Sequence, residues 1–238
     1  MTEQKPSQES SALTVRVSSS ASEYEGVRLA VEQTFRQSYV GWSSAVDRSF
    51  DDNTTFLTLT GDNQLLGGIR LIGRRRQQSS SPQQVNPLPF ELADNTEALP
   101  ATGQISVEYS GLWARQARYS IALSVLAGQW VADSQPHALA AAVYPADNHL
   151  LRRLYLDSLG LAAVPDLHMR YPGLKHRTSG TAVDWCMALD LPGTRMQRLQ
   201  QLTQRPYVRR ILDRCEFAVS DHDRSSAGVP HQASVAGK

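Results

Sequence analysis

The chain has 238 residues, of which 41% are hydrophobic, enough to bury the core of one domain. Its formal net charge of +1 excludes a global field that would attract nucleic acid or a membrane surface, so any charged partner must be recognised locally. No run approaches the roughly 18 apolar residues of a membrane span, and the first 20 residues lack the apolar stretch of a signal peptide.

The two cysteines, Cys186 and Cys215, do not have the spacing of metal ligands, and neither do the histidines, so no metal site is expected. Unpaired cysteines favour a reducing compartment, and a cytoplasmic location is therefore expected. Both ends of the chain are polar and serine-rich, which is typical of disordered segments. We expect tails over residues 1–20 and 219–238 around one domain over residues 21–218.

Hydrophobic periodicity predicts a series of helices and strands between these tails. In chain order they are a helix over residues 22–40, a β-hairpin over 56–72, a strand over 105–114, a helix over 114–134, a strand over 137–145, a helix over 149–161, a strand over 180–191 and a helix over 194–215. We expect the last helix to be interrupted or restarted at Pro206. The segment between the hairpin and the next strand is a long irregular loop, of a kind that is usually functional or mobile. This order predicts an α/β fold of the α+β type, in which a mixed, mostly antiparallel twisted sheet is flanked by helices.

The strand ISVEYSGLWA, residues 105–114, contains an acidic residue, Glu108, in its middle and a Ser110-Gly111 interruption in its second half. A glycine inside a strand often marks a β-bulge or a close approach of another backbone. Two interpretations of Glu108 stay open at this point. It is either a solvated strand residue paired with an arginine, or the base of an active site built where a strand separates from its neighbour.

Short motifs occur in a fixed order before and within this strand. They are Arg28, Phe35, Trp42, Phe50-Asp51, Gly67-Gly68-Ile69-Arg70-Leu71 and Glu108-Tyr109-Ser110. Together with the strand and helix over residues 137–161, their order and spacing resemble the GNAT superfamily of acyltransferases. Within that superfamily they resemble the acyl-homoserine lactone synthases and the long-chain N-acyl amino acid synthases. The resemblance implies the GNAT fold and an acyl-transfer reaction.

The sequence departs from the lactone synthase pattern at three positions, because Val46 and Arg48 stand where acids are found and Gly111 replaces an arginine. The resemblance therefore implies the acyl-transfer scaffold without the formation of a homoserine lactone from S-adenosylmethionine. The segment from Arg115 to Ser120 lacks the central glycine of the GNAT phosphate loop. For this reason an acyl carrier protein is expected as the donor in preference to coenzyme A.

The resemblance also implies roles for particular residues. Glu108 is expected to be the general base that deprotonates the acceptor amine, and Tyr155 is expected to protonate the leaving thiol. The residues expected to bind the substrates are Arg70, Asp51, Trp42, Phe35, Ser110 and Gly111. The residues expected on the donor or carrier side are Arg115, Arg118, Arg74, Arg75, Arg76, Arg152 and Arg153. Plain structural interpretations stay open beside these roles, since aromatic residues at helical spacing are commonly core and charge runs are commonly solvated faces.

The function expected from the resemblance is the transfer of an acyl group from a carrier-bound thioester to the amine of an amino acid or related small molecule. The acyl thioester, on an acyl carrier protein or on coenzyme A, would be a co-substrate, and no tightly bound cofactor is expected. Two alternatives stay open: a transferase of the same fold that uses an aminoacyl-tRNA donor, and an autoinducer-synthase-like or catalytically inactive binding module. The acyl chain length, the acceptor and the oligomeric state are not encoded in any linear pattern.

Overall fold

The computed structural model describes residues 12–74, 87–94 and 104–219. Its centre is an eight-stranded sheet with the strand order β10-β1-β3-β4-β5-β6-β9-β7. The strands are β1 (Leu13–Ser18), β3 (Thr54–Gly61), β4 (Gln64–Gly73), β5 (Ile105–Ala114), β6 (Leu139–Pro145), β7 (Ala162–Ala163), β9 (Trp185–Asp190) and β10 (Cys215–Val219). Only β1–β10 and β5–β6 pair in parallel among these strands, so the predicted mixed, mostly antiparallel sheet is confirmed.

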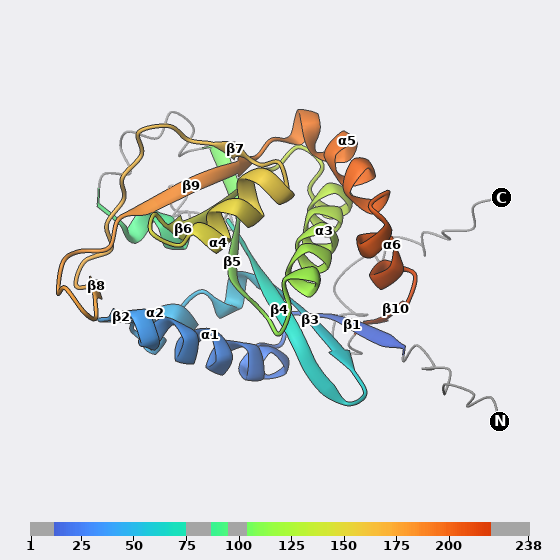
Figure 1. Ribbon diagram of the computed structural model, residues 1–238, viewed down its shortest axis with the longest axis horizontal. Helices are drawn as coiled ribbons and strands as arrows, with labels where there is room; N and C mark the ends of the chain where they lie inside the picture. Colours follow the sequence, from blue (N-terminus) through green and yellow to red (C-terminus); the bar gives the residue numbers. More distant parts are fainter. Residues whose placement is uncertain (1–11, 75–86, 95–103, 220–238) are drawn as a thin grey trace, which may run out of the picture.

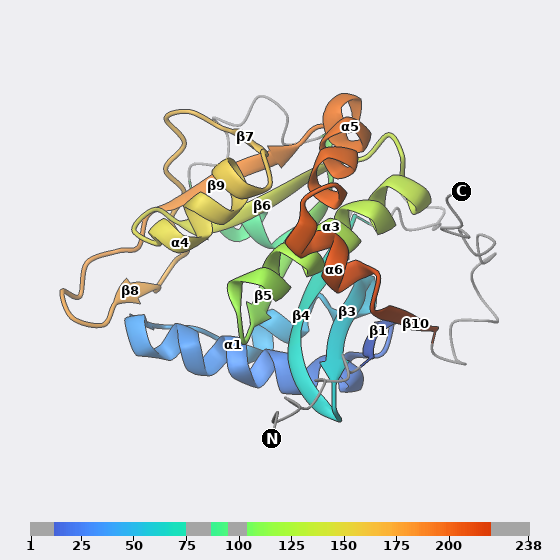
Figure 2. The same cartoon turned by 45° about the vertical axis from the view of Figure 1, so that its right-hand side comes forward.

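Helices cover both faces of this sheet (Figures 1 and 2). On one face lie α1 (Glu25–Ser38) and α2 (Ser44–Arg48), preceded by a short 3-10 turn, η1 (Ala21–Tyr24). On the other face α3 (Ala117–Ser134) packs on β3, β4 and β5, and α5 (Pro192–Thr203) and α6 (Pro206–Leu212) pack on α3. The remaining helical segments are η2 (Asp51–Asn53), η3 (Pro89–Leu92), α4 (His149–Arg152) and the π-helical η6 (Arg153–Ser158). No described helix has the length and apolar character needed to cross a bilayer.

Local sequence signals account for several of these elements. Asp62 and Asn63 form the turn between β3 and β4 with φ values of 51° and 57°, the left-handed conformation that a two-residue hairpin turn requires and that these residue types tolerate. Asn148 caps α4 by accepting a hydrogen bond from the Leu151 N–H at 3.1 Å. Pro206 begins α6, so the terminal helix is divided at the proline where the sequence predicts an interruption.

The expected N-terminal tail is wrong over part of its length. Residues 13–18 form β1, whose Leu13 and Val15 are buried, and this strand pairs with β3 on one side and β10 on the other. The alternating apolar residues that specify β1 are embedded in a serine-rich stretch, which gave the segment the composition of a tail. At the other end, residue 219 is still part of β10, and residues 1–11 and 220–238 lie outside the described residues.

A second strand pair forms a small separate sheet. It joins β2 (Tyr39–Val40), which follows α1, to β8 (Lys175–His176) in an antiparallel pair. The described part of the long loop is likewise not a simple surface segment, because Leu88 and Phe90 in and beside η3 are completely buried. Both features contribute to the wall of the cavity described next.

Candidate active site

The two parallel strands in the middle of the sheet, β5 and β6, separate before they end. Their last residues paired with each other are Tyr109 and Ala142. Beyond these, β5 continues to Ala114 and β6 to Pro145 with no further pairing between the two strands. A gap between two neighbouring strands frees backbone groups that would otherwise bond across the sheet. The separation therefore gives a ligand access to the backbone of β5.

On its other side, β5 carries a β-bulge against β4. Arg70 is opposite Ser110, whereas Gly68 is opposite Trp113, so β5 holds one residue more than β4 between these pairs. Gly111 within the bulge has φ = 59°, in the left-handed region that glycine adopts without strain. The interruption seen in the sequence is thus a bulge at the point where the strand also separates from β6.

A cavity of about 440 Å³ lies at this separation, a size typical of small-molecule sites. Its walls include Gly111 and Leu112 of β5 and Val143 and Pro145 of β6. The opposite walls come from α1, from the residues after it and from the segment around β8. The aromatic residues that line the cavity include Phe35, Tyr39, Trp42, Tyr155, Tyr171 and Trp185.

Phe35 is the centre of this aromatic lining. Its ring centroid lies 4.6 Å from that of Tyr39, 4.9 Å from that of Trp42 and 5.9 Å from that of Trp185. These distances are those of attractive aromatic pairs, so the rings form one connected wall. Phe35 and Trp42, which are expected from the sequence to bind substrate, therefore both lie in the wall of the cavity.

Glu108 lines the cavity and is only 3% exposed. Its Oε2 atom accepts a hydrogen bond from the Phe90 backbone N–H at 2.9 Å. Burial disfavours the carboxylate and raises the pKa of Glu108 from its usual value of 4.5 to about 8, although the Phe90 amide and the Arg70 charge both act to lower it. A carboxylate with this proton affinity and this position is suited to remove a proton from an ammonium group.

Tyr155 reaches the same cavity from η6 and is 4% exposed. The π-helical turn, in which the Leu159 N–H bonds to the Leu154 carbonyl at 2.8 Å, holds one more residue than an α-helical turn, and such turns are often found at functional sites. Burial raises the pKa of the Tyr155 hydroxyl above its ordinary value, and the negative charge of Glu108 raises it further. Tyr155 therefore lines the cavity as a protonated hydroxyl at neutral pH.

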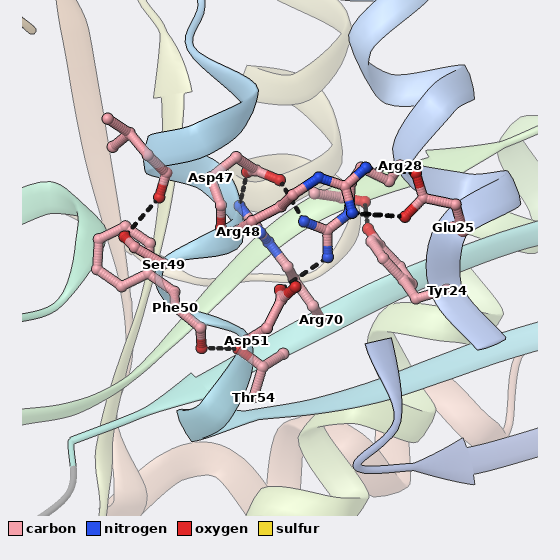
Figure 3. A network of polar contacts seen from close by, with 12 residues as sticks. Tyr24, Glu25, Arg28, Asp47, Arg48, Ser49, Phe50, Asp51, Thr54 and Arg70 are labelled. Carbon is pink, nitrogen blue, oxygen red and sulfur yellow. Dashed lines mark hydrogen bonds and ion pairs between the residues drawn. The ribbon is translucent and has the colours of Figure 1, made fainter. Parts of the chain in front are cut away.

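Arg70 belongs to a buried network of charged groups between α1, α2 and the sheet (Figure 3). Its guanidinium forms an ion pair with Asp47, and its Nη2 atom lies 3.3 Å from Ser110 Oγ. Asp47 also accepts a hydrogen bond from Arg28 at 3.2 Å, and Arg28 in turn bonds to Asp51 at 2.7 Å. Arg28 also pairs with Glu25 at 3.6 Å, so three carboxylates balance the two buried arginines.

The charged network differs from the sequence-based expectation at two aspartates. Of the residues expected to bind substrates, Asp51 is the one that does not line the cavity, because its carboxylate is bound to Arg28. Asp47 is not among the residues predicted from the sequence, although it lines the cavity and is 7% exposed. A signal for it is present in the chain, because Asp47 lies between Val46 and Arg48, the two positions that the family resemblance marks as acidic.

The basic residues expected on the donor side fall into two groups. Arg115 and Arg118 are exposed at the N-terminus of α3, directly after β5, and the exposed Arg152 and Arg153 lie on α4 and at the start of η6. Arg74 lies instead at the opposite end of β5, where its backbone N–H bonds to the Ser106 carbonyl at 2.8 Å. The structure therefore does not bring Arg74 together with this cationic surface.

Residues 75 and 76, which were expected beside them, lie outside the described residues. Among the described residues, no group of three or more histidine, cysteine or acidic side chains is placed to hold a metal ion.

A mixed sheet whose central parallel strands separate over a ligand cavity, beside a bulged strand, is the arrangement of the GNAT fold. No protein-family model matches the chain, and the comparison with curated proteins finds no significant match. Among solved structures, FeeM, an N-acyl amino acid synthase from uncultured soil microbes, superposes with a TM-score of 0.57 over 82% of this chain and 98% of FeeM, at 12% sequence identity. This likeness shows a shared fold, and the fold predicted from the sequence is confirmed.

Two further solved structures are also similar to the chain. BjaI, a coenzyme A-dependent acyl-homoserine lactone synthase, is 14% identical and gives a TM-score of 0.46 over 87% of this chain and 93% of BjaI. The spermidine/spermine N-acetyltransferase SpeG from Vibrio cholerae is 13% identical and gives a TM-score of 0.48 over 79% of this chain and 98% of SpeG.

Proposed function

We propose that this chain is an N-acyltransferase, which moves an acyl group from a carrier-bound thioester to the amine of an amino acid or related small molecule. The observation that carries the proposal is Glu108, a buried carboxylate with a pKa of about 8 in the wall of an apolar cavity, next to a bulge in the same strand. The GNAT fold supports the reaction class, because its strand separation exposes backbone amides beside such a carboxylate. Fold alone would not support it, since one fold hosts many functions.

The reaction starts when ionised Glu108 removes a proton from the ammonium group of the acceptor. The neutral nitrogen attacks the thioester carbonyl carbon, and the carbonyl oxygen gains a negative charge in the tetrahedral intermediate. Neither β4 nor β6 has a residue in register with Gly111 or Leu112, so their N–H groups are candidates to stabilise this oxyanion. The carbonyl then reforms as the carbon–sulfur bond breaks, and the Tyr155 hydroxyl gives its proton to the leaving thiolate. The cationic nitrogen of the new amide loses its remaining extra proton to the Tyr155 phenolate, which restores Tyr155, and Glu108 releases its proton to solvent.

The donor is proposed to approach from the N-terminus of α3. The exposed Arg115 and Arg118 lie at this end of the helix, where the helix dipole and free N–H groups attract phosphate. Both coenzyme A and the prosthetic arm of an acyl carrier protein bring a phosphate of this kind. We favour the carrier protein because Leu150 of α4 is 79% exposed beside the cationic Arg152 and Arg153, a surface that fits an acidic protein.

The test is product analysis with defined donors. The purified chain is incubated with a pool of amino acids and simple amines and, in separate reactions, with octanoyl and palmitoyl carrier protein, the matching coenzyme A thioesters, and aminoacyl-tRNA. Mass spectrometry of the small-molecule products is expected to show an N-acyl amine with the carrier protein donor and none with folded Glu108→Gln. Product only from aminoacyl-tRNA would replace the proposed donor, and no product from any donor would favour a binding module.

A further inference from the structure

The contact between Glu108 and the Phe90 amide depends on a short segment that precedes it in the chain. This segment is η3, a single turn over Pro89–Leu92 whose Phe90 side chain is completely buried. Phe90 is the residue whose N–H reaches Glu108 Oε2 at 2.9 Å. A one-turn helix has little intrinsic stability, so the direction of this N–H must be fixed by contacts outside the turn.

Arg74 and Glu91 supply such contacts. The Arg74 guanidinium bonds to Glu91 Oε1 at 2.6 Å and, through Nε, to the Ile105 carbonyl at 3.0 Å. Glu91 Oε2 accepts a hydrogen bond from the Leu88 N–H at 2.8 Å, which closes the turn on its own side chain. Both charged side chains are less than one-fifth exposed, so the ion pair is only partly screened by water.

The consequence is a continuous connection from the start of β5 to the candidate base. Arg74 holds the β5 backbone at Ile105 with one part of its side chain and Glu91 with another. Glu91 fixes the turn, and the turn presents the Phe90 N–H to Glu108, three residues after Ile105 on the same strand. Each link is a hydrogen bond between groups that are buried or half-buried.

We propose that Arg74 and Glu91 are positioning residues that fix the Phe90 amide against Glu108 and thereby set the proton affinity of the base. The inference rests on the proposed function insofar as Glu108 is the base. It gives Arg74 a role different from the donor contact that its position in the sequence indicated. Neither residue lines the cavity, so the expected effect is on the ionisation of Glu108 and not on substrate contact.

The direction of the effect follows from the groups that face Glu108. Arg70 from β4 and the Phe90 amide from η3 lower its pKa, the charge of Glu91 raises it, and burial raises it most. Tyr155 and Tyr171 also lie within the electrostatic reach of Glu108, but both hydroxyls keep their protons. Loss of the Phe90 hydrogen bond removes a favourable contact of the ionised form, so the pKa of Glu108 rises.

The experiment compares Arg74→Met with wild type and with Arg209→Met. Arg209 carries the same charge on the exposed surface of α6, and its replacement controls for the change in net charge. The pH dependence of kcat/KM is measured with the donor that the wild type accepts. In parallel, the Glu108 carboxyl is titrated by NMR in protein labelled with 13C at glutamate side chains, with Glu108→Gln assigning the signal.

For Arg74→Met we expect the midpoint of both curves to rise and the activity at pH 7 to fall by up to about tenfold, with recovery at higher pH. A shift of one pKa unit changes the ionised fraction below the midpoint by about that factor. Arg209→Met is expected to follow the wild type. Where Arg74→Met does not fold, Arg74→Gln removes the charge more conservatively and is expected to shift both midpoints in the same direction.

A uniform loss of activity with unchanged midpoints would overturn the inference, because a purely structural role has that signature. The NMR titration keeps the two proposals separable. If the wild type acylates no amine but the Glu108 midpoint still rises in Arg74→Met, the positioning role stands and the proposed reaction fails. An unchanged Glu108 titration in Arg74→Met overturns the positioning role whatever the activity.

Discussion

The Tyr24 hydroxyl donates a hydrogen bond to the Gly111 carbonyl and so joins the turn before α1 to the bulge of β5. Tyr24 is 1% exposed, and its ring lies 5.0 Å from that of Phe56 on β3, which fixes the direction of the hydroxyl. The bulge is therefore held by a side chain from another element as well as by its own strand. Arg70 supports it from β4 through its contact with Ser110.

Tyr24→Phe tests whether this bond organises the site. The substitution leaves the Gly111 carbonyl without its buried donor, which typically costs about 1–3 kcal/mol of stability. If the bulge positions the oxyanion donors, kcat is expected to fall about tenfold while KM changes little. Steady-state kinetics with the accepted donor, together with denaturant unfolding, measure both effects.

A matched control for Tyr24→Phe is Tyr207→Phe. Tyr207 lies on α6, and its hydroxyl accepts a hydrogen bond from Arg205 at the surface. Its replacement is expected to leave kcat unchanged. A Tyr24→Phe enzyme with wild-type kcat would show that the bulge keeps its catalytic geometry without the bond.

Gly111→Ala tests the bulge by adding a side-chain atom within it. A Cβ atom at this position would lie 2.5 Å from the Tyr24 hydroxyl oxygen and 3.2 Å from Arg70 Nε, so the side chains of Tyr24 and Arg70 would have to move. The left-handed φ of 59° adds about 1–2 kcal/mol of backbone strain for a residue with a side chain. We expect Gly111→Ala to lose most of its activity and to unfold at lower denaturant.

Gly180→Ala separates strain from contact. Gly180 has a similar φ of 68°, but a Cβ atom there would meet nothing within 4 Å. Gly180→Ala is expected to lose only the stability that backbone strain costs and to keep full activity. Equal losses of stability in the two variants would mean that the contacts of Gly111 with Tyr24 and Arg70 relax at no cost.

Much of this arrangement is readable from local sequence. The hairpin of β3 and β4 follows from two alternating runs around Asp62-Asn63, and the interruption at Ser110-Gly111 predicts the bulge. Glu108 is noticed because a carboxylate is unusual inside a strand that reads as half-buried. These features depend on residues close together in the chain, so their meaning does not require the fold.

Other features depend on contacts between segments that are distant in the chain, and local sequence does not predict them. Asp47 is an ordinary polar residue until α2 places it between Arg28 and Arg70. The donor to Glu108 is a backbone N–H of Phe90, which carries no residue-type signal at all. The position of Arg74 also depends on a distant segment. Only the antiparallel pairing of β4 with β5 shows that Arg74 lies at the opposite end of β5 from Arg115.

Asp47→Asn tests the energetic weight of the buried charge network. The change removes the carboxylate that pairs with both Arg28 and Arg70, and it leaves the buried Arg70 without this ion pair. Removal of one partner from a buried ion pair typically destabilises a protein by about 3–5 kcal/mol, because the remaining charge is uncompensated. Urea unfolding is expected to show a loss of this order for Asp47→Asn.

An exposed ion pair provides the comparison for Asp47→Asn. Asp213 pairs with Arg209 at 3.7 Å on the surface of the protein, where water and salt screen the charges. Asp213→Asn is expected to change the stability far less. Equal effects of the two substitutions would show that the Asp47 network is hydrated in solution and not buried.

Glu108→Gln is predicted to change stability in a pH-dependent way. The pKa of Glu108 is raised from 4.5 to about 8 in the folded chain, so the folded state binds more protons than the unfolded state between these values. The free energy of unfolding of the wild type therefore decreases as pH rises from about 4.5 to about 8. Above that range the ionisation of Glu108 causes no further change in stability. Glutamine carries no such charge, so the variant escapes this loss.

The expected result is a Glu108→Gln protein that matches wild type near pH 4 and exceeds it at pH 9 by an amount on the order of a few kcal/mol. Chemical denaturation at a series of pH values measures the difference. Glu216→Gln on β10 removes an exposed carboxylate and is expected to give no such divergence.

The same raised pKa of Glu108 requires that wild-type kcat/KM increase with pH through about 8, since only the ionised carboxylate accepts the proton of the amine. Parallel stability curves for wild type and Glu108→Gln would mean that Glu108 is ionised at neutral pH, and the acid limb of the activity profile would then lie near pH 4.5.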